Sequence, residues 1–298
     1  MERKLYLTGA SGLLGRAVRT KFAEEGWTVY GTALNRISPV LHRVDLNDNI
    51  AVEKSLSSFK PNYIIHCAAE RFPDRVQADP NKAEQLNVGA TKNLVELADK
   101  LSVPVLYIST DYVFNGKSPP FKVNDIPSPV NLYGELKLRG EEATLETSSR
   151  NAVLRIPVLY GPVEKLSESA VTVLLENLLN ASQPQEVSNY EKRRPSHVND
   201  IAEICFQMAS KTLQGSNIQG IYHWCGKEKF TKYEMVLKMA GVFELPHSHI
   251  TAAADPPQGT TTRPYDTTLD TSRLDALHIG QHTSFADGIH SALKGWIK

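Results

Sequence analysis

Short apolar runs alternate with longer segments of helical periodicity through the first half of the chain. The apolar runs predict β-strands at residues 4–8, 28–34, 63–67, 105–109 and 152–156. Apolar positions three and four residues apart predict helices at residues 13–25, 48–59, 79–100 and 133–147. The run Tyr-Ile-Ile-His-Cys at residues 63–67 is typical of a parallel strand that is covered on both faces. This alternation predicts an α/β fold with a doubly wound parallel sheet.

The alternation becomes irregular after about residue 157. Helices are predicted at residues 166–179, 199–211 and 232–243, a strand at 220–224, and a loop rich in Pro, Gly, Thr and Asp at 255–273. We therefore expect residues 1–157 to form the main sheet domain. Residues 158–298 should form mainly a smaller C-terminal lobe, with some segments returning to the sheet domain.

The composition is that of an ordinary globular protein. Of 298 residues, 41% are hydrophobic and 22% are charged, and the formal net charge is zero. This balance gives no reason to expect binding to nucleic acid or to an anionic membrane. No run of about 18 apolar residues and no secretory leader is visible, and the three cysteines, Cys67, Cys205 and Cys225, are far apart. The sequence therefore predicts a cytoplasmic protein with reduced thiols and no metal site.

A run of glycines follows the first predicted strand. Residues 9–15 read Gly-Ala-Ser-Gly-Leu-Leu-Gly and lead into the first predicted helix. Glycines permit a tight turn here and let main-chain N–H groups approach a pyrophosphate, which the helix dipole also favours. The run therefore predicts a Rossmann-type dinucleotide site. The residues expected to contact the cofactor there are Gly9, Ser11, Gly12, Leu13, Leu14 and Gly15.

The residues after the second strand indicate which dinucleotide binds. An acidic residue at this place would accept the ribose hydroxyls of NAD, whereas this chain has Leu34, Asn35 and Arg36. A guanidinium pairs with a 2′-phosphate, so Asn35 and Arg36 favour NADP(H). The alternative is that Arg36 is a solvated loop residue. Asp45, followed by Leu46, either accepts a hydrogen bond from the adenine amino group or caps the next helix.

Tyr133 and Lys137 open a predicted helix with the spacing Y-x-x-x-K. Residues four apart share one helix face, and an ammonium beside a phenol lowers the pKa of the phenol. We expect Tyr133 to donate a proton to a carbonyl oxygen as hydride reaches the carbonyl carbon. Thr110 comes just after a strand, where it can orient Tyr133 and hydrogen-bond the carbonyl. The alternative is a surface pair without chemistry.

Nearly the whole chain resembles the extended short-chain dehydrogenases/reductases. The motifs that carry the resemblance are the glycine run, Cys67-Ala68-Ala69, Asn87, Thr110 and the pair Tyr133 and Lys137. It implies that Thr110, Tyr133 and Lys137 are the catalytic set and that Asn87 fixes the helix geometry that holds the lysine. The further cofactor contacts that it implies are Cys67, Ala68, Ala69, Tyr133, Lys137, Pro157 and Val158.

Two groups within that family match over longer segments. Residues 109–116, 263–264 and 269–274 resemble the dTDP-4-dehydrorhamnose reductases. Residues 66–71, 155–161, 163–166, 168–173 and 231–235 resemble, more closely, the regulatory β subunits of methionine adenosyltransferase. Both resemblances imply the same fold and cofactor. The implied functions differ, because the first group is enzymatic and the second modulates a partner.

Candidate substrate contacts lie outside the cofactor motifs. A nucleotide-sugar carries two phosphates, which guanidinium groups bind in bidentate fashion. Arg194, in a Lys-Arg-Arg-Pro run, and Arg263 are therefore candidates, the alternative being solvated loops. Asp111 and Tyr112 either touch a sugar hydroxyl or only pack. Glu70, a further substrate candidate, begins a Glu-Arg-Phe-Pro run where the reductases usually carry a small polar stretch, so the chain departs from them at the sugar contacts.

These features predict an NADPH-dependent reductase of a UDP- or dTDP-linked 4-keto-6-deoxyhexose, with an NDP-L-rhamnose as product. The alternative is a regulatory β subunit that docks on the methionine adenosyltransferase catalytic subunit and holds NADP(H) as a structural ligand. A redox-sensing or transcriptional regulator on the same fold is a third hypothesis. The sequence leaves open a homodimer. It also leaves open a 3,5-epimerase activity, for which Cys67, Glu70 and Lys137 are the nearby acid/base candidates.

Overall fold

A parallel sheet of seven strands forms the centre of the computed structural model, which describes residues 2–36, 38–256, 259 and 261–297. The strands are β1 (Lys4–Thr8), β2 (Thr28–Ala33), β3 (His42–Arg43), β4 (Tyr63–His66), β5 (Val105–Thr110), β6 (Ala152–Ile156) and β10 (Gly220–His223). Their order is β10-β6-β5-β4-β1-β2-β3, and every neighbouring pair is parallel. The predicted doubly wound α/β fold is therefore confirmed.

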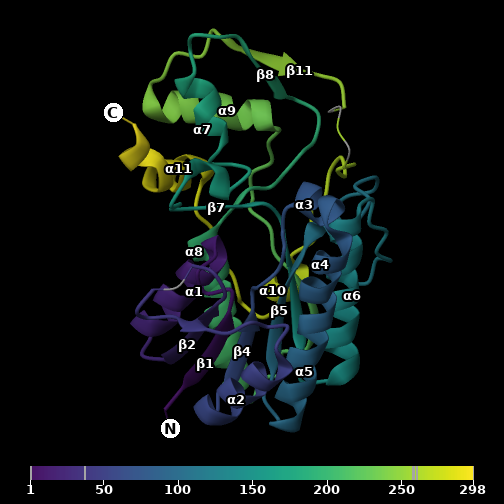
Figure 1. Ribbon diagram of the computed structural model, residues 1–298. Coiled ribbons are helices and arrows are strands. Elements are labelled where there is room, and N and C mark those ends of the chain that lie inside the picture. The colour runs from purple at the N-terminus through teal and green to yellow at the C-terminus, as the bar shows by residue number, and fades with distance from the viewer. Residues whose placement is uncertain (1, 37, 257–258, 260, 298) are drawn as a thin grey trace.

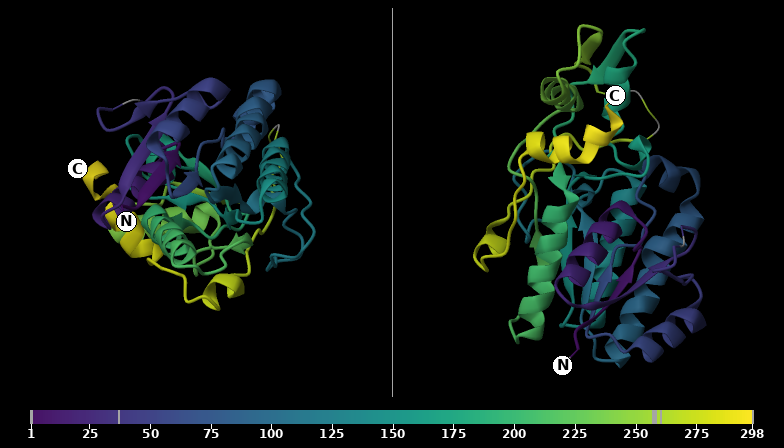
Figure 2. Two further views of the ribbon diagram at one scale, coloured as in Figure 1. Left: turned by 90° about the horizontal axis from the view of Figure 1, so that it is seen from below. Right: turned by 90° about the vertical axis from the view of Figure 1, so that its left-hand side faces the viewer.

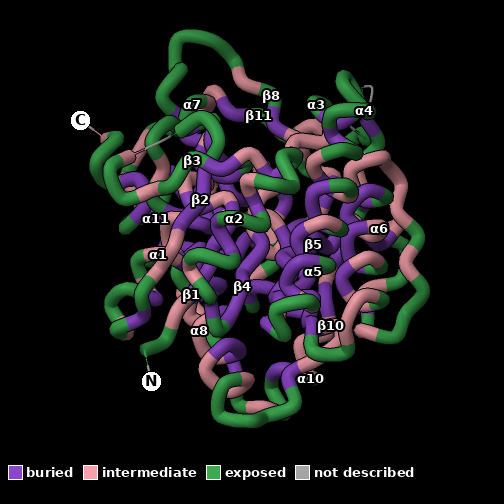
Figure 3. Tube along the Cα trace, turned by 60° about the horizontal axis from the view of Figure 1, so that its bottom comes forward, coloured by how far each residue is buried: buried purple, intermediate pink, exposed green. Residues whose placement is uncertain are grey.

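Helices cover both faces of the sheet (Figure 1). They are α1 (Leu13–Glu24), α2 (Asn49–Phe59), α5 (Ala90–Lys100), α6 (Leu132–Thr147) and α8 (Val198–Leu213). Because successive strand residues point to opposite faces, Leu5 and Leu7 pack into the core under α1 and α8. Tyr6, between them, packs into the core under α2 and α5. The strands are thus enclosed on both sides, as the buried centre of Figure 3 shows.

A smaller lobe lies beyond the carboxyl ends of the strands (Figures 1 and 2). It contains α7 (Leu174–Leu179), α9 (Lys232–Phe243), α11 (Phe285–Leu293) and the paired strands β8 (Gln185–Ser188) and β11 (Ile250–Ala253). Leu175, Met239 and Ile289 are buried in its separate hydrophobic core. A further short pair, β7 (Leu159–Tyr160) with β9 (Ser196–His197), lies between the lobe and the sheet. The lobe therefore stands over the edge of the sheet at which ligands bind in such folds.

The helix predicted at residues 79–100 is interrupted in the structure. It consists of α4 (Pro80–Glu84), a π-helical turn (Gln85–Gly89) and α5. Asp79 caps its start by accepting a hydrogen bond from the main-chain N–H of Lys82 at 3.2 Å. The π-helical turn adds one residue per turn at Asn87, and such turns often serve to redirect a side chain.

The helix predicted at residues 166–179 is also divided. Leu166–Glu168 form a 3₁₀ turn, and α7 begins only at Leu174. The hydroxyl of Ser169 lies between them, donating to the carbonyl of Leu159 at 2.6 Å and accepting from the N–H of Val171 at 3.0 Å. Side-chain hydrogen bonds of this kind compete with the helical ones, which explains the break.

Several short elements were not predicted from the sequence. These are α3 (Pro73–Ala78), α10 (Ser272–Asp275), α11, β8, β11 and a 3₁₀ turn at Lys294–Trp296. No helix in the described residues is long and apolar enough to cross a membrane. All three cysteines are free, as predicted, and the described residues contain no cluster of three His, Cys, Asp or Glu side chains suited to a metal ion.

Candidate functional site

A cavity of about 660 Å³ opens between the carboxyl ends of the strands and the lobe. All the residues predicted to bind the cofactor line it: Gly9, Ser11, Gly12, Leu13, Leu14, Gly15, Asn35, Arg36, Asp45, Leu46, Cys67, Ala68, Ala69, Tyr133, Lys137, Pro157 and Val158. Four other predicted site residues also line it: Thr110, Asp111, Tyr112 and Arg263. Asn87, Glu70 and Arg194 are not among the lining residues. The topology thus brings together motifs that are far apart in the sequence.

The glycine loop between β1 and α1 is built for close main-chain approach. Gly9 has φ +65°, and a Cβ there would lie 2.8 Å from the main-chain nitrogen of Ala68. A Cβ at Gly15 would lie 2.1 Å from the carbonyl oxygen of Gly9. Helix α1 begins at Leu13 without a side-chain cap. Its first N–H groups are therefore available at the cavity wall, an arrangement that suits the pyrophosphate of a dinucleotide.

The loop after β2 lies beside acidic residues that begin the lobe. Arg36 contacts Glu164 Oε2 at 3.1 Å and Glu168 Oε1 at 2.9 Å through Nη1. Arg36 is therefore neither buried nor simply solvated: 48% of its side chain is exposed. The suggestion that Asp45 caps the next helix is wrong, because α2 is capped by Asp48, whose carboxylate accepts from the N–H of Ala51 at 3.0 Å.

Asp45 instead organises its own turn. Its Oδ1 accepts hydrogen bonds from the main-chain N–H of Asn47 at 2.9 Å and from the Asn47 side chain at 3.3 Å. Asp45, Leu46 and Asn47 all line the cavity. Among the described residues, the hydrogen bonds to the Asp45 carboxylate run through Oδ1, and the contact with an adenine amino group stays a prediction.

Tyr133 and Lys137 lie on the first turns of α6, where Lys137 is buried and Tyr133 is partly buried at the cavity. Burial lowers the pKa of Lys137 to about 7, although Glu141 opposes the shift. Burial likewise raises the pKa of Tyr133 to about 12, and a hydrogen bond with Thr110 opposes this shift. The expectation that Lys137 lowers the pKa of Tyr133 is therefore wrong for the protein alone. Desolvation outweighs any effect of the ammonium on the phenol.

The ammonium of Lys137 is held by main chain and by an aromatic ring. Its Nζ donates to the carbonyl oxygen of Ile108 at 2.7 Å and lies 3.9 Å from the ring centroid of Tyr107. Both residues belong to β5, whose last residue is Thr110. Thr110 and Lys137 are therefore fixed relative to each other by one strand.

Asp111 forms a buried polar cluster next to the catalytic candidates. It accepts hydrogen bonds from Thr110 at 3.3 Å and from the hydroxyl of Thr267. Burial raises the pKa of Asp111 to about 6, against the lowering effect of Thr267 and Arg193. The hydroxyl of Tyr112 accepts from Arg193 at 3.3 Å. Both Asp111 and Tyr112 thus reach the cavity wall already engaged by neighbours.

Asn87 holds the loop that follows β4. Its Oδ1 accepts from the main-chain N–H of Glu70 at 2.8 Å, and its Nδ2 donates to the carbonyl of Glu70 at 3.0 Å. Asn87 is only 1% exposed. The side chain of Glu70 turns to its own loop, where Oε1 accepts from the N–H of Phe72 at 3.1 Å. Asn87 thus positions a cavity loop through its side chain, and its predicted role in holding the lysine stays a prediction.

The two predicted phosphate-binding arginines lie in different places. Arg263 lines the cavity and pairs with Asp74 at 2.8 Å. Arg194 does not line it: its guanidinium donates to the carbonyl oxygens of Gly226 at 3.1 Å and Lys227 at 2.6 Å, and to Thr268 at 3.2 Å. These bonds tie loops of the lobe together, which is a structural use of the side chain.

Three cations at the cavity were not predicted as site residues. They are Arg71, Lys82 and Lys232. Burial lowers the pKa of Arg71 and of Lys232, and the Arg71 guanidinium stacks on Phe72 at 4.2 Å from the ring centroid. Arg71 comes two residues after the Cys67-Ala68-Ala69 segment, so its position soon after a strand end was a usable signal. Lys232 begins a helix of the lobe, and nothing local in the sequence links it to the sheet.

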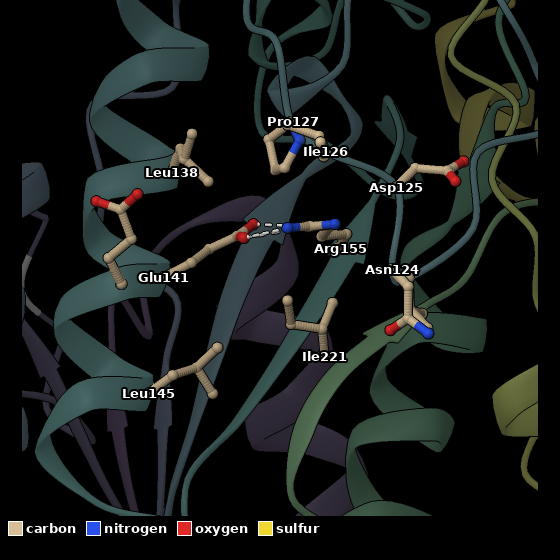
Figure 4. Close-up of a pocket in the computed structure, with 11 residues that line it drawn as sticks. Asn124, Asp125, Ile126, Pro127, Leu138, Glu141, Leu145, Arg155 and Ile221 are labelled. Atoms are coloured by element: carbon tan, nitrogen blue, oxygen red, sulfur yellow. Dashed lines mark hydrogen bonds and ion pairs between the residues drawn. The ribbon is translucent and has the colours of Figure 1, made fainter.

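A second, smaller cavity of about 300 Å³ has a different lining, which includes residues of α6, Arg155 and Ile221 (Figure 4). Glu141 and Arg155 lie at its floor as a buried ion pair, with Arg155 Nη2 2.6 Å from Glu141 Oε2. The hydroxyl of Ser109 also donates to Glu141. Leu138 and Leu145 add apolar walls. The pair thus connects α6 to β5 and β6 behind the candidate site.

Comparisons with known proteins give the chain its relatives. The profile of the RmlD substrate binding domain matches residues 3–296. Methionine adenosyltransferase 2 subunit beta of Xenopus tropicalis is 46% identical over 291 residues, 98% of this chain and 87% of that protein. The dTDP-4-dehydrorhamnose reductase of Aggregatibacter actinomycetemcomitans is 29% identical over 236 residues, 78% of this chain and 77% of that enzyme. Both resemblances inferred from the sequence are thus confirmed.

The fold also matches solved structures. The dTDP-4-dehydrorhamnose reductase of Bacillus anthracis in complex with NADP superimposes with a TM-score of 0.84 and 21% identity, covering 99% of each chain. At this identity the likeness concerns the architecture, including the lobe as well as the sheet.

Proposed function

The chain belongs to the RmlD substrate binding domain family, and on that premise we propose that it is an NADP(H)-binding regulatory subunit of a methionine adenosyltransferase. The observation that carries the proposal is the 46% identity to a β subunit over 98% of the chain. The reductase relative shares 29% over 78% of the chain. Because function resides in sites and surfaces rather than in the fold, identity that extends over the whole chain supports the β-subunit reading more strongly.

The part of the cavity beside the loop that follows β4 supports the same choice. Arg71, Phe72, Pro73 and Asp74 line it, and this is the segment that departs from the small polar stretch of the reductases. Arg71 is bound to the main-chain carbonyl of Glu168, so its bulky side chain is fixed in place. A bulky side chain that is fixed in the cavity wall suits a retained cofactor better than exchange of a sugar substrate.

NADP(H) suits the remaining residues of the cavity. The uncapped start of α1 offers N–H groups for the pyrophosphate, and Arg36 offers a guanidinium for the 2′-phosphate. Asp45 offers an acceptor for adenine, while Pro157 and Val158 would lie along the nicotinamide. We assign binding of the dinucleotide mainly to residues 1–157. Segments of residues 158–298 then close over it.

Association with the catalytic subunit tests this proposal. The purified chain is mixed with the methionine adenosyltransferase catalytic subunit of the same species, and the two are separated by size-exclusion chromatography with and without NADPH. Co-elution, together with a changed rate or KM of S-adenosylmethionine formation, is the expected result. Separate elution at micromolar concentrations of both chains, with unchanged kinetics, would contradict it.

The geometry also favours a second candidate function, NADPH-dependent reduction of a nucleotide-linked 4-keto-6-deoxyhexose. Thr110, Tyr133 and Lys137 line the same cavity as the cofactor residues. The cofactor would supply hydride to the carbonyl carbon. Tyr133 would donate its phenolic proton to the carbonyl oxygen, with Thr110 hydrogen-bonded beside it and Lys137 holding the ribose. Cys67 and Glu70 give an added epimerase step little support, because burial raises the pKa of Cys67 to about 12 and Glu70 lies off the cavity.

Turnover separates the two functions. NADPH absorbance is followed with UDP- and dTDP-4-keto-6-deoxyglucose, with and without an added 3,5-epimerase. Oxidation that needs the epimerase and is lost in Tyr133→Phe would support a reductase, and oxidation without it would add an epimerase step. NADPH binding without oxidation in any mixture is what the regulatory proposal expects.

A further inference from the structure

Glu168 lies at the centre of a cluster of three arginines from three separate parts of the chain. Arg16 of α1 forms a bidentate pair with it, Nη1 to Oε1 and Nη2 to Oε2, both at 2.8 Å. Arg36 of the loop after β2 contacts Oε1 at 2.9 Å. Arg71 donates to the main-chain carbonyl of the same residue. One residue of the lobe segment thus meets the glycine-loop helix and both loops that face the cofactor cavity.

Glu168 is a fixed acceptor, whereas its arginine partner at the cavity is a long and partly solvated side chain. The carboxylate is 3% exposed and Arg36 is 48% exposed. Although burial opposes ionisation, hydrogen bonds from Arg16, from Arg36 and from the N–H of Glu164 hold the pKa of Glu168 at about 2. It therefore remains charged at neutral pH and restrains a guanidinium that would otherwise sample many rotamers.

The way Arg36 is held leaves part of its guanidinium free. Within the part of the chain that the structure describes, the hydrogen bonds of Arg36 run through Nη1 alone. A guanidinium carries five N–H donors in a planar fork, so the N–H groups of Nε and Nη2 remain available to a phosphate. Arg36 also lines the cavity. Anchoring one nitrogen orients the plane of the fork without using up its donors.

We infer that Glu168 is the positioning residue for selectivity toward a 2′-phosphorylated dinucleotide, acting through Arg36. The inference rests on the NADP(H) part of the proposed function. Glu168 does not touch the cofactor in this scheme. It fixes the Arg36 fork in the orientation that receives the 2′-phosphate, so that binding orders few further side-chain torsions.

A carboxylate beside a phosphate site raises the question of repulsion. Arg16 offsets the repulsion between Glu168 and a phosphate, because a bidentate guanidinium partner at 2.8 Å neutralises the carboxylate. Glu164 differs: it is 59% exposed, and its contacts with Arg36 at 3.1 Å and Arg16 at 3.7 Å are weak surface pairs. The two acids therefore carry the same charge near the same arginine, but only the buried one is in a position to orient it.

This difference gives the experiment a matched control. 2′,5′-ADP and 5′-AMP differ only in the 2′-phosphate, so the ratio of their Kd values measures its recognition at the adenosine end alone. Calorimetric titration is made on the full-length protein and on the variants Glu168→Gln, Glu168→Asp, Glu164→Gln and Arg36→Ala. Thermal unfolding without ligand shows which variants are folded, and Glu168→Asp, which keeps the charge but shortens the reach to Arg36, serves if Glu168→Gln does not fold.

The ratio is expected to fall about tenfold in Glu168→Gln and Glu168→Asp, the amount one charge-assisted hydrogen bond is worth. Glu164→Gln should leave it within about twofold. In the Arg36→Ala background the Glu168 substitutions should change it no further, because the positioned group is gone.

An unchanged ratio in both Glu168 variants, an equal fall in Glu164→Gln, or a fall that persists in Arg36→Ala overturns the inference. A protein that binds 2′,5′-ADP selectively and still shows one of these results keeps its NADP(H) proposal, whereas failure of the wild-type protein to bind either nucleotide or NADPH overturns both.

Discussion

Lys137 donates a hydrogen bond from its buried ammonium to the main-chain carbonyl of Ile108 at 2.7 Å. The bond joins α6 to the strand that ends at Thr110, and it holds the ammonium of a side chain that is only 3% exposed. The carbonyl offers only a partial charge in return. The cost of burying Lys137 is therefore not fully offset, and its lowered pKa of about 7 reflects this.

This cost predicts an unusual dependence of stability on pH. The unfolded chain keeps Lys137 charged up to its ordinary pKa of 10.5, whereas the folded chain releases the proton near pH 7. Between these values the unfolded state binds more protons, so stability rises with pH. Relative to Lys137→Met, the wild-type protein should gain about 2 kcal/mol between roughly pH 6 and pH 8.5. Urea unfolding at the two pH values measures this, and a constant difference between the proteins would contradict it.

The geometry of the glycine loop predicts that alanine in place of Gly15 weakens dinucleotide binding. In Gly15→Ala the new Cβ would lie 2.1 Å from the carbonyl oxygen of Gly9 and 2.8 Å from the Cα of Ala10. Both neighbours are main chain, so the loop must move, at a cost of about 1–3 kcal/mol in stability. NADPH affinity should fall more than about tenfold because the pyrophosphate site is the part displaced.

Gly241→Ala provides the control for that substitution. Gly241 is an exposed residue within α9, and a Cβ there would meet nothing within 4 Å. Alanine should stabilise the helix by about 0.5–1 kcal/mol and leave NADPH binding unchanged. Calorimetric titration and thermal unfolding of both variants make the comparison. Equal effects at the two glycines would show that the loop has no special geometry.

Much of the cofactor side of the site could be predicted from the sequence. The glycine run, the residues after β2 and the Tyr133–Lys137 pair are each local signals with their own physical reason. Parallel strands bring them together, because the carboxyl ends of all strands meet at one edge of the sheet. The register of β1 with β2 and β4, which pairs Leu7 with both Gly31 and Ile65, then places these segments side by side.

The lobe side could not be predicted in the same way. Arg16 and Glu168 are 152 residues apart, and Thr267 lies 156 residues from Asp111. Such pairs depend on how the lobe segments return over the sheet, and no local pattern reports this. The failures were of the same kind: Arg194 was chosen for its charge, but main-chain carbonyls of the lobe use its donors.

Asn87 predicts an effect on the cofactor cavity through the loop that follows β4. Its two hydrogen bonds with the main chain of Glu70 hold the loop that contains Cys67 and Ala68. Asn87→Ala leaves both main-chain groups without their partner, at a cost of about 1–3 kcal/mol. NADPH binding should weaken several-fold, because this loop lines the cavity through Cys67, Ala68 and Arg71.

Asn93→Ala is the matched control for Asn87. Its buried Nδ2 has no hydrogen-bond partner among the described residues, so the same substitution removes no bond. Asn93→Ala should change the melting temperature by no more than about one or two degrees, as expected for a site without special contacts. It should leave NADPH affinity unchanged. Unchanged NADPH affinity and stability in Asn87→Ala would contradict the role of Asn87 in holding this loop.

The buried pair of Glu141 and Arg155 predicts that removing one charge lowers stability strongly and that removing both charges restores most of it. Arg155 donates to both carboxylate oxygens of Glu141, and its Nη1 donates to His223, whose other ring nitrogen donates to the carbonyl of Phe121. Both members of the pair are about 1% exposed. Arg155→Met leaves an unpaired carboxylate in the interior, which costs about 3–5 kcal/mol.

Glu141→Leu combined with Arg155→Met removes both charges and should recover most of that loss, since a hydrophobic pair of similar volume is often as stable as a buried ion pair. Urea unfolding of the wild-type protein and the two variants tests this at neutral pH. A double variant as unstable as Arg155→Met would mean that the packing of these side chains beside the smaller cavity, and not their charge, stabilises this part of the sheet.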